Sequence, residues 1–154
     1  MKPLMNQGNQ EMVEGNGSPV RRVLLLEDDI DLCHALKDWL EMNGCAVTIV
    51  HRGVEGVTEV MKTDFDAIVC DMVMPMMPGD MFYLAVGKAK PHLCTRFVFI
   101  TGHRDRPDIA KFLWEYHGPT LNKPLDLQEL LCAVRQVFDA TARDRTARMK
   151  GLPM

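Results

Sequence analysis

The chain lacks any long uninterrupted apolar run, and its first residues have no apolar core of the kind found in signal peptides. A membrane-spanning helix needs about 20 consecutive apolar residues, and a secretory signal needs a shorter apolar segment near the N-terminus. The formal net charge is only −3, so bulk charge gives no support for binding to nucleic acid or to an anionic membrane. We therefore expect a cytoplasmic protein with neither a membrane nor a nucleic-acid partner.

Paired cysteines are also absent, because no CxxC motif occurs in the chain. The five cysteines lie mostly within apolar stretches: Cys33, Cys45, Cys70, Cys94 and Cys132. Disulfide scaffolds and zinc sites typically show cysteines at short, paired spacings. We therefore expect reduced thiols in the core of a cytosolic protein, and a cysteine metal site has little support.

What the chain does contain is the composition of one globular domain, with 154 residues, 47% apolar and 25% charged. Short apolar runs predict strands at 23–26, 46–51, 65–71, 96–101 and 120–122. Amphipathic segments after them predict helices at 30–43, 54–62, 81–90, 105–116 and 127–138. Five alternations of this kind predict an α/β fold with a doubly wound parallel sheet, covered by helices on both faces.

Local signals refine the helix limits. Asp80 is predicted to cap the third helix, and Asp126 with Glu129 has the capping-box spacing that opens the fifth helix. The apolar face of that last helix is predicted to be Leu127, Leu130, Leu131, Val134 and Phe138.

The two ends of the chain differ from the middle. Residues 1–20 show no periodicity and predict a disordered tail, and residues 21–138 form the predicted domain. Residues 139–154 are rich in arginine and too few for an output domain. We interpret them as a solvated, fraying extension of the last helix, with a basic docking arm as the alternative.

The third predicted strand, 65–71, ends in Asp71 and runs into a loop rich in Met, Pro and Gly. A short apolar run with these boundaries is typical of a buried parallel strand. The carboxyl ends of such strands form the ligand crevice of open α/β sheets. An acid at a strand end is more often a helix cap or a solvated loop residue, so Asp71 alone does not establish a site.

Polar residues follow the other predicted strands as well: Glu27 and Asp28, Thr101, and Lys123. Taken singly, the acids suggest the start of a helix, the threonine a backbone hydrogen bond and the lysine a surface charge. Three carboxylates held together repel one another by about 4 kcal/mol per pair at roughly 4 Å and an effective dielectric of about 20. A hard cation such as Mg²⁺ offsets this repulsion. Metal, hydroxyl and lysine around Asp71 then form a site suited to a phosphoryl group, with the aspartate as nucleophile.

Four motifs carry a family resemblance, in the order Leu24-Leu25-Leu26-Glu27-Asp28-Asp29, Asp71-x-x-Met74-Pro75-x-Met77-x-Gly79, Ile100-Thr101-Gly102 and Lys123-Pro124. Over about residues 21–138 the chain closely resembles receiver domains of two-component response regulators. The resemblance implies a flavodoxin-like (βα)5 fold with strand order 2-1-3-4-5. It also implies that Asp71 takes a phosphoryl group from a phosphohistidine on a histidine kinase or a histidine phosphotransfer protein.

Individual roles follow from the same resemblance. The implied magnesium ligands are Glu27, Asp28, Asp71 and the backbone carbonyl of Val73. Thr101 is implied to bond one phosphoryl oxygen and to move on activation, and Lys123 to pair with another. The Lys123–Pro124 peptide bond is cis in that family.

The chain departs from the family at the position three residues before the lysine, where many receivers have Tyr or Phe as an aromatic switch. This chain has Thr120, so the signal is expected to leave through strand 96–101 and helix 105–116, or through changed dimerisation. Val73 and His103 occupy positions that tune dephosphorylation in the family. Because Val73 has no polar group to orient a water, we predict a fairly long-lived phosphoryl group.

Three other functions are alternatives to this one. A phosphohydrolase forming an aspartyl phosphate usually has a second Asp at the position of Val73, and a degenerate receiver would lack part of the motif set. Flavin binding is disfavoured because residues 27–29 are acidic and repel a flavin phosphate.

The resemblance also bears on partners and output. The fourth helix, fifth strand and fifth helix are the implied output surface, acting on a downstream protein or forming a homodimer. A phosphoryl group adds about −1.5 to −2 charges, enough to bias a two-state element. Both a stand-alone receiver and one excised from a hybrid histidine kinase fit the sequence, and neither would turn over an external substrate.

Overall fold

A computed structural model describes residues 4–5, 12–13 and 19–151 of the chain. Its centre is a five-stranded sheet in which every neighbouring pair is parallel. In spatial order the strands are β4 (Cys45–Val50), β3 (Arg21–Leu26), β5 (Ala67–Asp71), β6 (Phe97–Thr101) and β7 (Thr120–Asn122). Since β3 is the first strand of this sheet along the chain, the predicted order 2-1-3-4-5 is confirmed.

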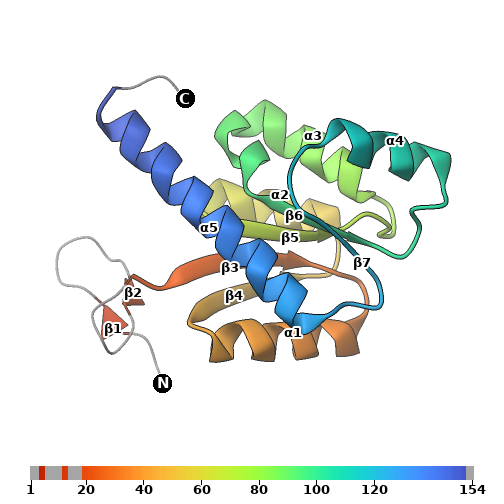
Figure 1. The fold of residues 1–154 in the computed structure, drawn as a ribbon, viewed down its shortest axis with the longest axis horizontal. Helices are drawn as coiled ribbons and strands as arrows, with labels where there is room; N and C mark the ends of the chain where they lie inside the picture. The colour runs from red at the N-terminus through yellow and green to blue at the C-terminus, as the bar shows by residue number, and fades with distance from the viewer. Residues whose placement is uncertain (1–3, 6–11, 14–18, 152–154) are drawn as a thin grey trace.

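Helices cover both faces of the sheet (Figure 1). They are α1 (Ile30–Met42), α2 (Gly53–Lys62), α3 (Gly79–Ala89), α4 (Pro107–Glu115) and α5 (Leu127–Met149), with a 3₁₀ helix η1 (Pro91–Thr95) before β6. The helices α1 and α5 lie on one face, and α2, α3 and α4 lie on the other. The flavodoxin-like, doubly wound architecture is therefore confirmed.

The alternation of β3 shows why its sequence is an uninterrupted apolar run. Leu24 and Leu26 pack into the layer under α2, α3 and α4, whereas Val23 and Leu25 pack into the layer under α1 and α5. All four side chains are fully buried, and each such burial contributes about 1.5–3 kcal/mol. A strand buried on both faces has no solvent side, so its sequence shows no polar alternation.

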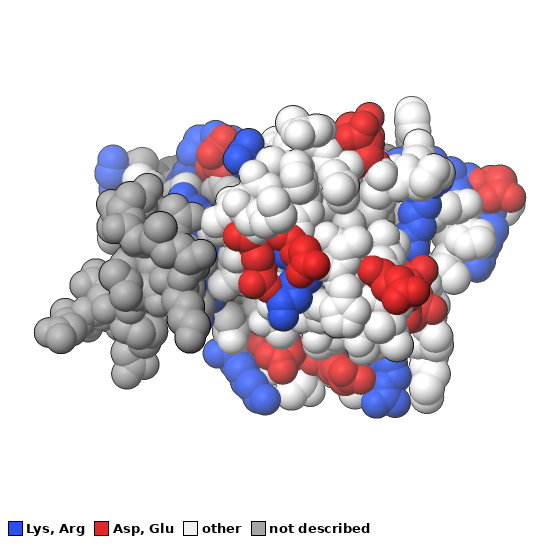
Figure 2. Space-filling view, turned by 90° about the horizontal axis from the view of Figure 1, so that it is seen from below, with Lys and Arg blue, Asp and Glu red and all other residues white. Residues whose placement is uncertain are grey.

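Figure 2 shows the molecule from below the view of Figure 1, the side on which α1 lies. Acidic and basic side chains are interspersed on this face instead of forming one basic patch, in keeping with the net charge of −3. None of the helices within residues 19–151 combines the length and the apolar character needed to cross a membrane.

Two predicted helix starts were wrong. The helix α3 begins at Gly79, with Pro78 as the N-cap residue, so Asp80 lies in its first turn, where it accepts a hydrogen bond from the Met81 amide. The helix α4 begins at Pro107, two residues later than predicted, because proline is well suited to the first turn of a helix. The cap at Asp126 is confirmed, since its side chain accepts from the amides of Gln128 and Glu129.

The N-terminal prediction of disorder is wrong where the structure describes the tail. Strand β1 (Leu4–Met5) pairs antiparallel with β2 (Met12–Val13), and Val20 is buried next to β3. The remaining residues of the predicted tail, 1–3, 6–11 and 14–18, lie outside the described residues.

The C-terminal prediction also needs correction. The helix α5 continues past Phe138 to Met149 without a break, and the segment from 139 onward packs back on the domain. Thr141 is 2% exposed and donates its hydroxyl to the Asp66 carbonyl at 3.1 Å. Arg145 forms ion pairs with Asp64 and Asp66. The extension is helical as predicted, but up to Arg145 it is not simply solvated and frayed.

Two predictions of burial fail in part. All five cysteines are free, as expected, but Cys132 is exposed and Cys94 only partly buried. In α5, Leu127 is 39% exposed, whereas the other four predicted core residues are buried. Both Leu127 and Cys132 lie on turns of α5 whose outward side meets solvent.

Candidate functional site

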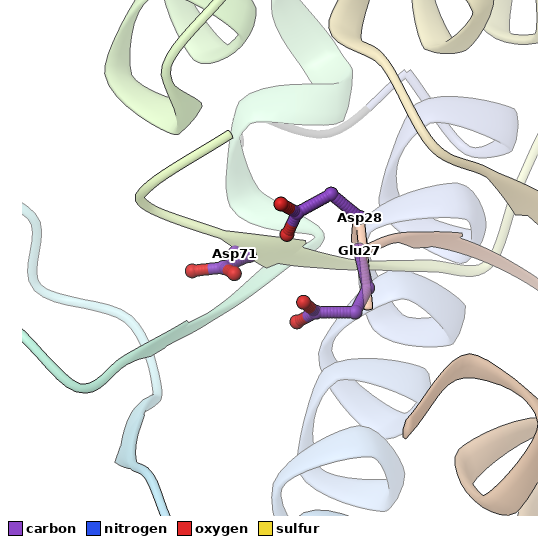
Figure 3. Close-up of side chains that lie close together, drawn as sticks. All are labelled: Glu27, Asp28 and Asp71. Atoms are coloured by element: carbon purple, nitrogen blue, oxygen red, sulfur yellow. The ribbon is translucent and has the colours of Figure 1, made fainter. Parts of the chain in front are cut away.

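The strand ends bring five polar side chains to one edge of the sheet. Glu27 and Asp28 follow β3, Asp71 ends β5, Thr101 ends β6, and Lys123 follows β7. Figure 3 shows the carboxylates of the three acids gathered beyond the strand ends. One oxygen from each acid lies within 4.8 Å of the others. The sequence therefore predicted correctly which acids meet.

Burial differs among the three acids. Glu27 has no exposed surface and Asp71 is 3% exposed, whereas Asp28 is exposed. Two carboxylates thus lie in the floor of the site and one at its rim. Isolated buried charges of one sign are costly, so this arrangement needs a partner of opposite charge.

Lys123 supplies part of that partner. Its Nζ lies 2.9 Å from Asp71 Oδ2 and 2.9 Å from Glu27 Oε2. The contact with Asp71 is a hydrogen bond, but the contact with Glu27 is an ion pair, and buried Oε2 accepts no directed hydrogen bond from any described residue. One lysine thus serves two buried carboxylates, which leaves the floor of the site with excess negative charge.

The titration of Glu27 reflects this excess. Burial, against the lowering effect of Lys123 and with a further rise from the charge of Asp71, brings the pKa of Glu27 to about 7. Burial by itself would lower the pKa of Lys123, but its contacts with the carboxylates of Asp71 and Glu27 prevail, so that pKa is raised. The lysine therefore stays charged. The negative charge that it does not neutralise is balanced by a bound proton or cation.

The backbone holds Asp71 in place from the loop that follows it. The amide of Val73 donates to Asp71 Oδ1 at 3.1 Å, and the amide of Gly79 donates to the Met72 carbonyl at 3.0 Å. A Cβ at Gly79 would lie 2.6 Å from the Asp71 carbonyl oxygen and 2.9 Å from Met72 Cα. Only glycine lets α3 begin this close to the end of β5.

Thr101 and Lys123 are joined through the backbone. Thr101 is 1% exposed, and its Oγ1 accepts a hydrogen bond from the His103 amide at 2.9 Å. Its carbonyl accepts from the Lys123 amide at 2.9 Å. The Lys123–Pro124 peptide bond is cis, as the resemblance implied.

The donor set suits a hard divalent cation. Three carboxylates provide oxygen ligands, and Glu27 Oε2 is the buried acceptor left without a directed hydrogen bond. Oxygen ligands, with one side open to water, match the preference of Mg²⁺. No such match exists for a thiolate-binding metal, because the described cluster contains no cysteine or histidine.

A supporting layer behind Glu27 was missed by the sequence reasoning. Cys33 Sγ donates to the Glu27 carbonyl at 3.1 Å, and His51 Nδ1 lies 2.9 Å from the same oxygen. Burial and the nearby Glu27 charge raise the pKa of the Cys33 thiol to about 12, so it stays protonated. His51 thus supports the backbone at Glu27, and no spacing in the sequence links the two residues.

Comparison with known proteins gives the same picture. A family model described as the response regulator receiver domain matches residues 23–135. The chain is 27% identical over 113 residues to the transcription factor SKN7 of Candida albicans, covering 73% of this chain and 20% of that protein. It is 28% identical over 123 residues to the probable transcriptional regulator ycf29 of Pyropia yezoensis, covering 80% and 54%. The chain therefore spans about half the length of these relatives, or less.

A solved structure shares the fold. The CheY-like response regulator receiver domain protein from Methanospirillum hungatei superposes with a TM-score of 0.73 at 22% identity, covering 81% of this chain and 98% of that chain. The family match runs from Val23 in β3 into α5 and includes the other four strands of the sheet and the residues at the carboxyl ends of all five. The chain belongs to the family of response regulator receiver domains.

Proposed function

We propose that Asp71 accepts a phosphoryl group from a phosphohistidine on a histidine kinase or a histidine phosphotransfer protein. The observation that carries this proposal is the contact of Asp71 Oδ2 with Lys123 Nζ at 2.9 Å beside an acidic cluster. A carboxylate needs help to attack a phosphoryl group, since both carry negative charge. Lysine and a cation offset that repulsion.

The transfer is written as an in-line displacement. An Asp71 carboxylate oxygen forms a bond to phosphorus while the phosphorus–nitrogen bond of the donor histidine breaks, and its electron pair stays on the imidazole nitrogen. The proposed Mg²⁺ ligands are Glu27, Asp28, Asp71 and the backbone carbonyl of Val73. Bound there, Mg²⁺ supplies charge neutralisation at the phosphoryl oxygens.

Two side chains are proposed to hold the product. Lys123 keeps its charge and pairs with one phosphoryl oxygen in place of Asp71 Oδ2. The Thr101 hydroxyl, now an acceptor for the His103 amide, is proposed to donate to another phosphoryl oxygen. This change at Thr101 is the first step by which phosphorylation would alter the surface.

Receiver domains are signalling modules, and we propose that this one has no turnover of an external substrate. The side chain of Val73, two residues past Asp71, offers no acid for hydrolysis, which argues against a phosphohydrolase. The same residue underlies the prediction of a long-lived phosphoryl group. A degenerate receiver is disfavoured because all five site residues are present, and flavin binding because the pocket is acidic.

The proposed output is a change in protein–protein contacts, made in the cytoplasm. Trp114 on α4 is 84% exposed and is a natural anchor for a partner or for a second copy of the chain. The names of the curated relatives describe transcriptional regulators, so a linked or separate DNA-binding output is a further candidate for the downstream step.

Intact-mass measurement after incubation with acetyl phosphate and Mg²⁺ tests the proposal. We expect one added phosphoryl group on the wild type and none on Asp71→Asn. The matched control is Asp38→Asn, an exposed acid on α1, which should be modified like the wild type. Modification of Asp71→Asn at the wild-type level would refute Asp71 as acceptor, and loss of the group within seconds would refute the predicted lifetime.

A further inference from the structure

Arg104 bridges two parts of the fold through Thr120, the residue at the position where many receivers have an aromatic switch. It lies in the loop between β6 and α4. Its Nη2 donates to Thr120 Oγ1 at 2.7 Å, and its Nε donates to Asn122 Oδ1. Both acceptors are on β7, the edge strand of the sheet. The planar guanidinium has two parallel donors and can hold both acceptors together.

The other end of this loop is tied to the proposed phosphorylation site. The His103 amide donates to Thr101 Oγ1 at 2.9 Å, and Thr101 is paired in register with Asn122 on β7. A chain of only four residues therefore joins the Thr101 hydroxyl to the Arg104 guanidinium. Movement of the hydroxyl toward Asp71 must either break the His103 bond or pull the loop with it.

The loop between β6 and α4 can move when the site changes. Residues 102–106 are exposed, so the loop is not fixed by core packing. Beneath α4, by contrast, Tyr116 is fixed, because its hydroxyl donates to the Phe97 carbonyl at 2.6 Å and its ring packs on Phe99 with centroids 4.9 Å apart. The Arg104 bridge is thus an exposed, polar contact between this loop and β7.

We propose that Arg104 is a positioning residue that holds the β6–α4 loop in its unphosphorylated arrangement and releases Thr120 and Asn122 when Asp71 is phosphorylated. This inference rests on the proposed function and concerns the regulation of the same site. In many receivers an aromatic side chain changes its rotamer on activation. In this chain the Arg104 guanidinium would instead break its hydrogen bonds to Thr120 and Asn122. Release would free the side-chain hydrogen-bond acceptors of Thr120 and Asn122 on the edge strand, where Thr120 lies next to α5.

Thermodynamic linkage gives the sign of the effect. Since the bridge stabilises only the unphosphorylated arrangement, its removal favours the phosphorylated one, and a ligand selective for that state binds more tightly. Because Arg104 is exposed, we expect about a two- to tenfold change, the range of one net hydrogen bond.

The experiment measures the apparent dissociation constant for beryllofluoride with Mg²⁺, a stand-in for the phosphoryl group, by titration of the whole chain. Arg104→Ala and Arg104→Lys should both bind about two- to tenfold more tightly, because the single ammonium of lysine cannot bridge both acceptors. The matched control is Arg106→Ala, from the same loop, whose side chain pairs with Asp108 and which should bind like the wild type. Thr120→Val removes one acceptor without changing Arg104, and it should also bind beryllofluoride more tightly. This variant keeps the test valid if an Arg104 variant fails to fold.

A second readout separates switching from a static surface contact. In NMR spectra of the wild type, the Arg104 Nε–H should be protected from exchange in the free protein and lose that protection with beryllofluoride. Unchanged affinity in the Arg104 and Thr120 variants, or protection kept in the bound state, would overturn the inference while wild-type binding leaves the proposed function intact. Failure of the wild type to bind beryllofluoride would overturn both.

Discussion

Glu27 is the residue on which the chemistry of the pocket places the strongest demand. It is fully buried beside a second buried carboxylate, and the two share one lysine. Its raised pKa of about 7 means that near neutral pH it exchanges a proton for any cation that binds. Asp28 at the rim and Asp71 in the floor then complete an oxygen site for that cation.

The pH dependence of stability tests this account of Glu27. A carboxyl whose pKa rises from 4.5 to about 7 on folding binds its proton more tightly in the folded state. Without Mg²⁺, its contribution to stability is therefore present below about pH 4.5 and is lost as the pH rises to about 7. The full loss is on the order of 3 kcal/mol. Glu27→Gln should flatten this slope in denaturant unfolding measured from pH 4.5 to 7.5.

Saturating Mg²⁺ is the companion measurement for Glu27. A cation that displaces the proton should reduce or reverse the slope in the wild type and have a smaller effect on Glu27→Gln. An identical slope in wild type and variant, with and without Mg²⁺, would contradict the assignment.

Among the elements, α5 has the unexpected role. It is the longest helix, and its far end is attached to the start of β5, at the edge of the sheet opposite to the site (Figure 1). Arg145 pairs with Asp64 and Asp66, and the buried Arg96 also pairs with Asp64. These arginines lower the pKa of Asp64 against the effect of burial. The cluster fixes the direction of the helix beyond Phe138.

Removing the Arg145 contacts should loosen the end of α5. Arg145→Ala is expected to lower the free energy of unfolding by about 1–2 kcal/mol, because partly exposed charge pairs are individually weak. Amide exchange should increase mainly beyond Phe138. Arg143→Ala is the matched control, since Arg143 is exposed on the same helix, and it should change neither quantity. Equal effects of the two substitutions would contradict the role of the cluster.

At the scale of the whole molecule, the pocket lies at the carboxyl ends of the strands, and the contact of α5 with Asp64 and Asp66 lies at their amino ends. The proposed ligand at the strand ends would bridge β3, β5, β6 and β7, since Glu27, Asp71, Thr101 and Lys123 lie at or just beyond the ends of these strands. Ligand binding to the folded state alone raises its stability by mass action.

Beryllofluoride with Mg²⁺ should therefore raise the melting temperature. At about one hundred times the dissociation constant the gain is about 2.7 kcal/mol, which is roughly 5–10 °C for a domain of this size. Calorimetry of wild type and Asp71→Asn, with and without the ligand, measures it. The variant should show little of the shift, and sedimentation under the same conditions tests the proposed homodimer.

The sequence by itself determined the class of fold and which polar side chains gather at the strand ends. Five apolar runs predict buried strands because each strand of a doubly wound sheet is covered on both faces, which requires the pattern of Val23 to Leu26. Strand ends converge at one end of any such sheet, so Glu27, Asp71 and Lys123 could be placed together from their positions, while their proposed roles came from the resemblance to receiver domains. These features depend on the local hydrophobic pattern and on the way that parallel strands are connected through helices. Both can be recognised in the sequence.

Only the tertiary structure decided which distant side chains pair. The bond from Arg145 to Asp66 spans 79 positions, and that from Arg104 to Thr120 joins a loop to an edge strand 16 positions away. The length of α5 and the contact of His51 with Glu27 belong to the same class. Polar contacts of this kind follow from the exact packing distance between elements, and no periodicity in the sequence encodes that distance.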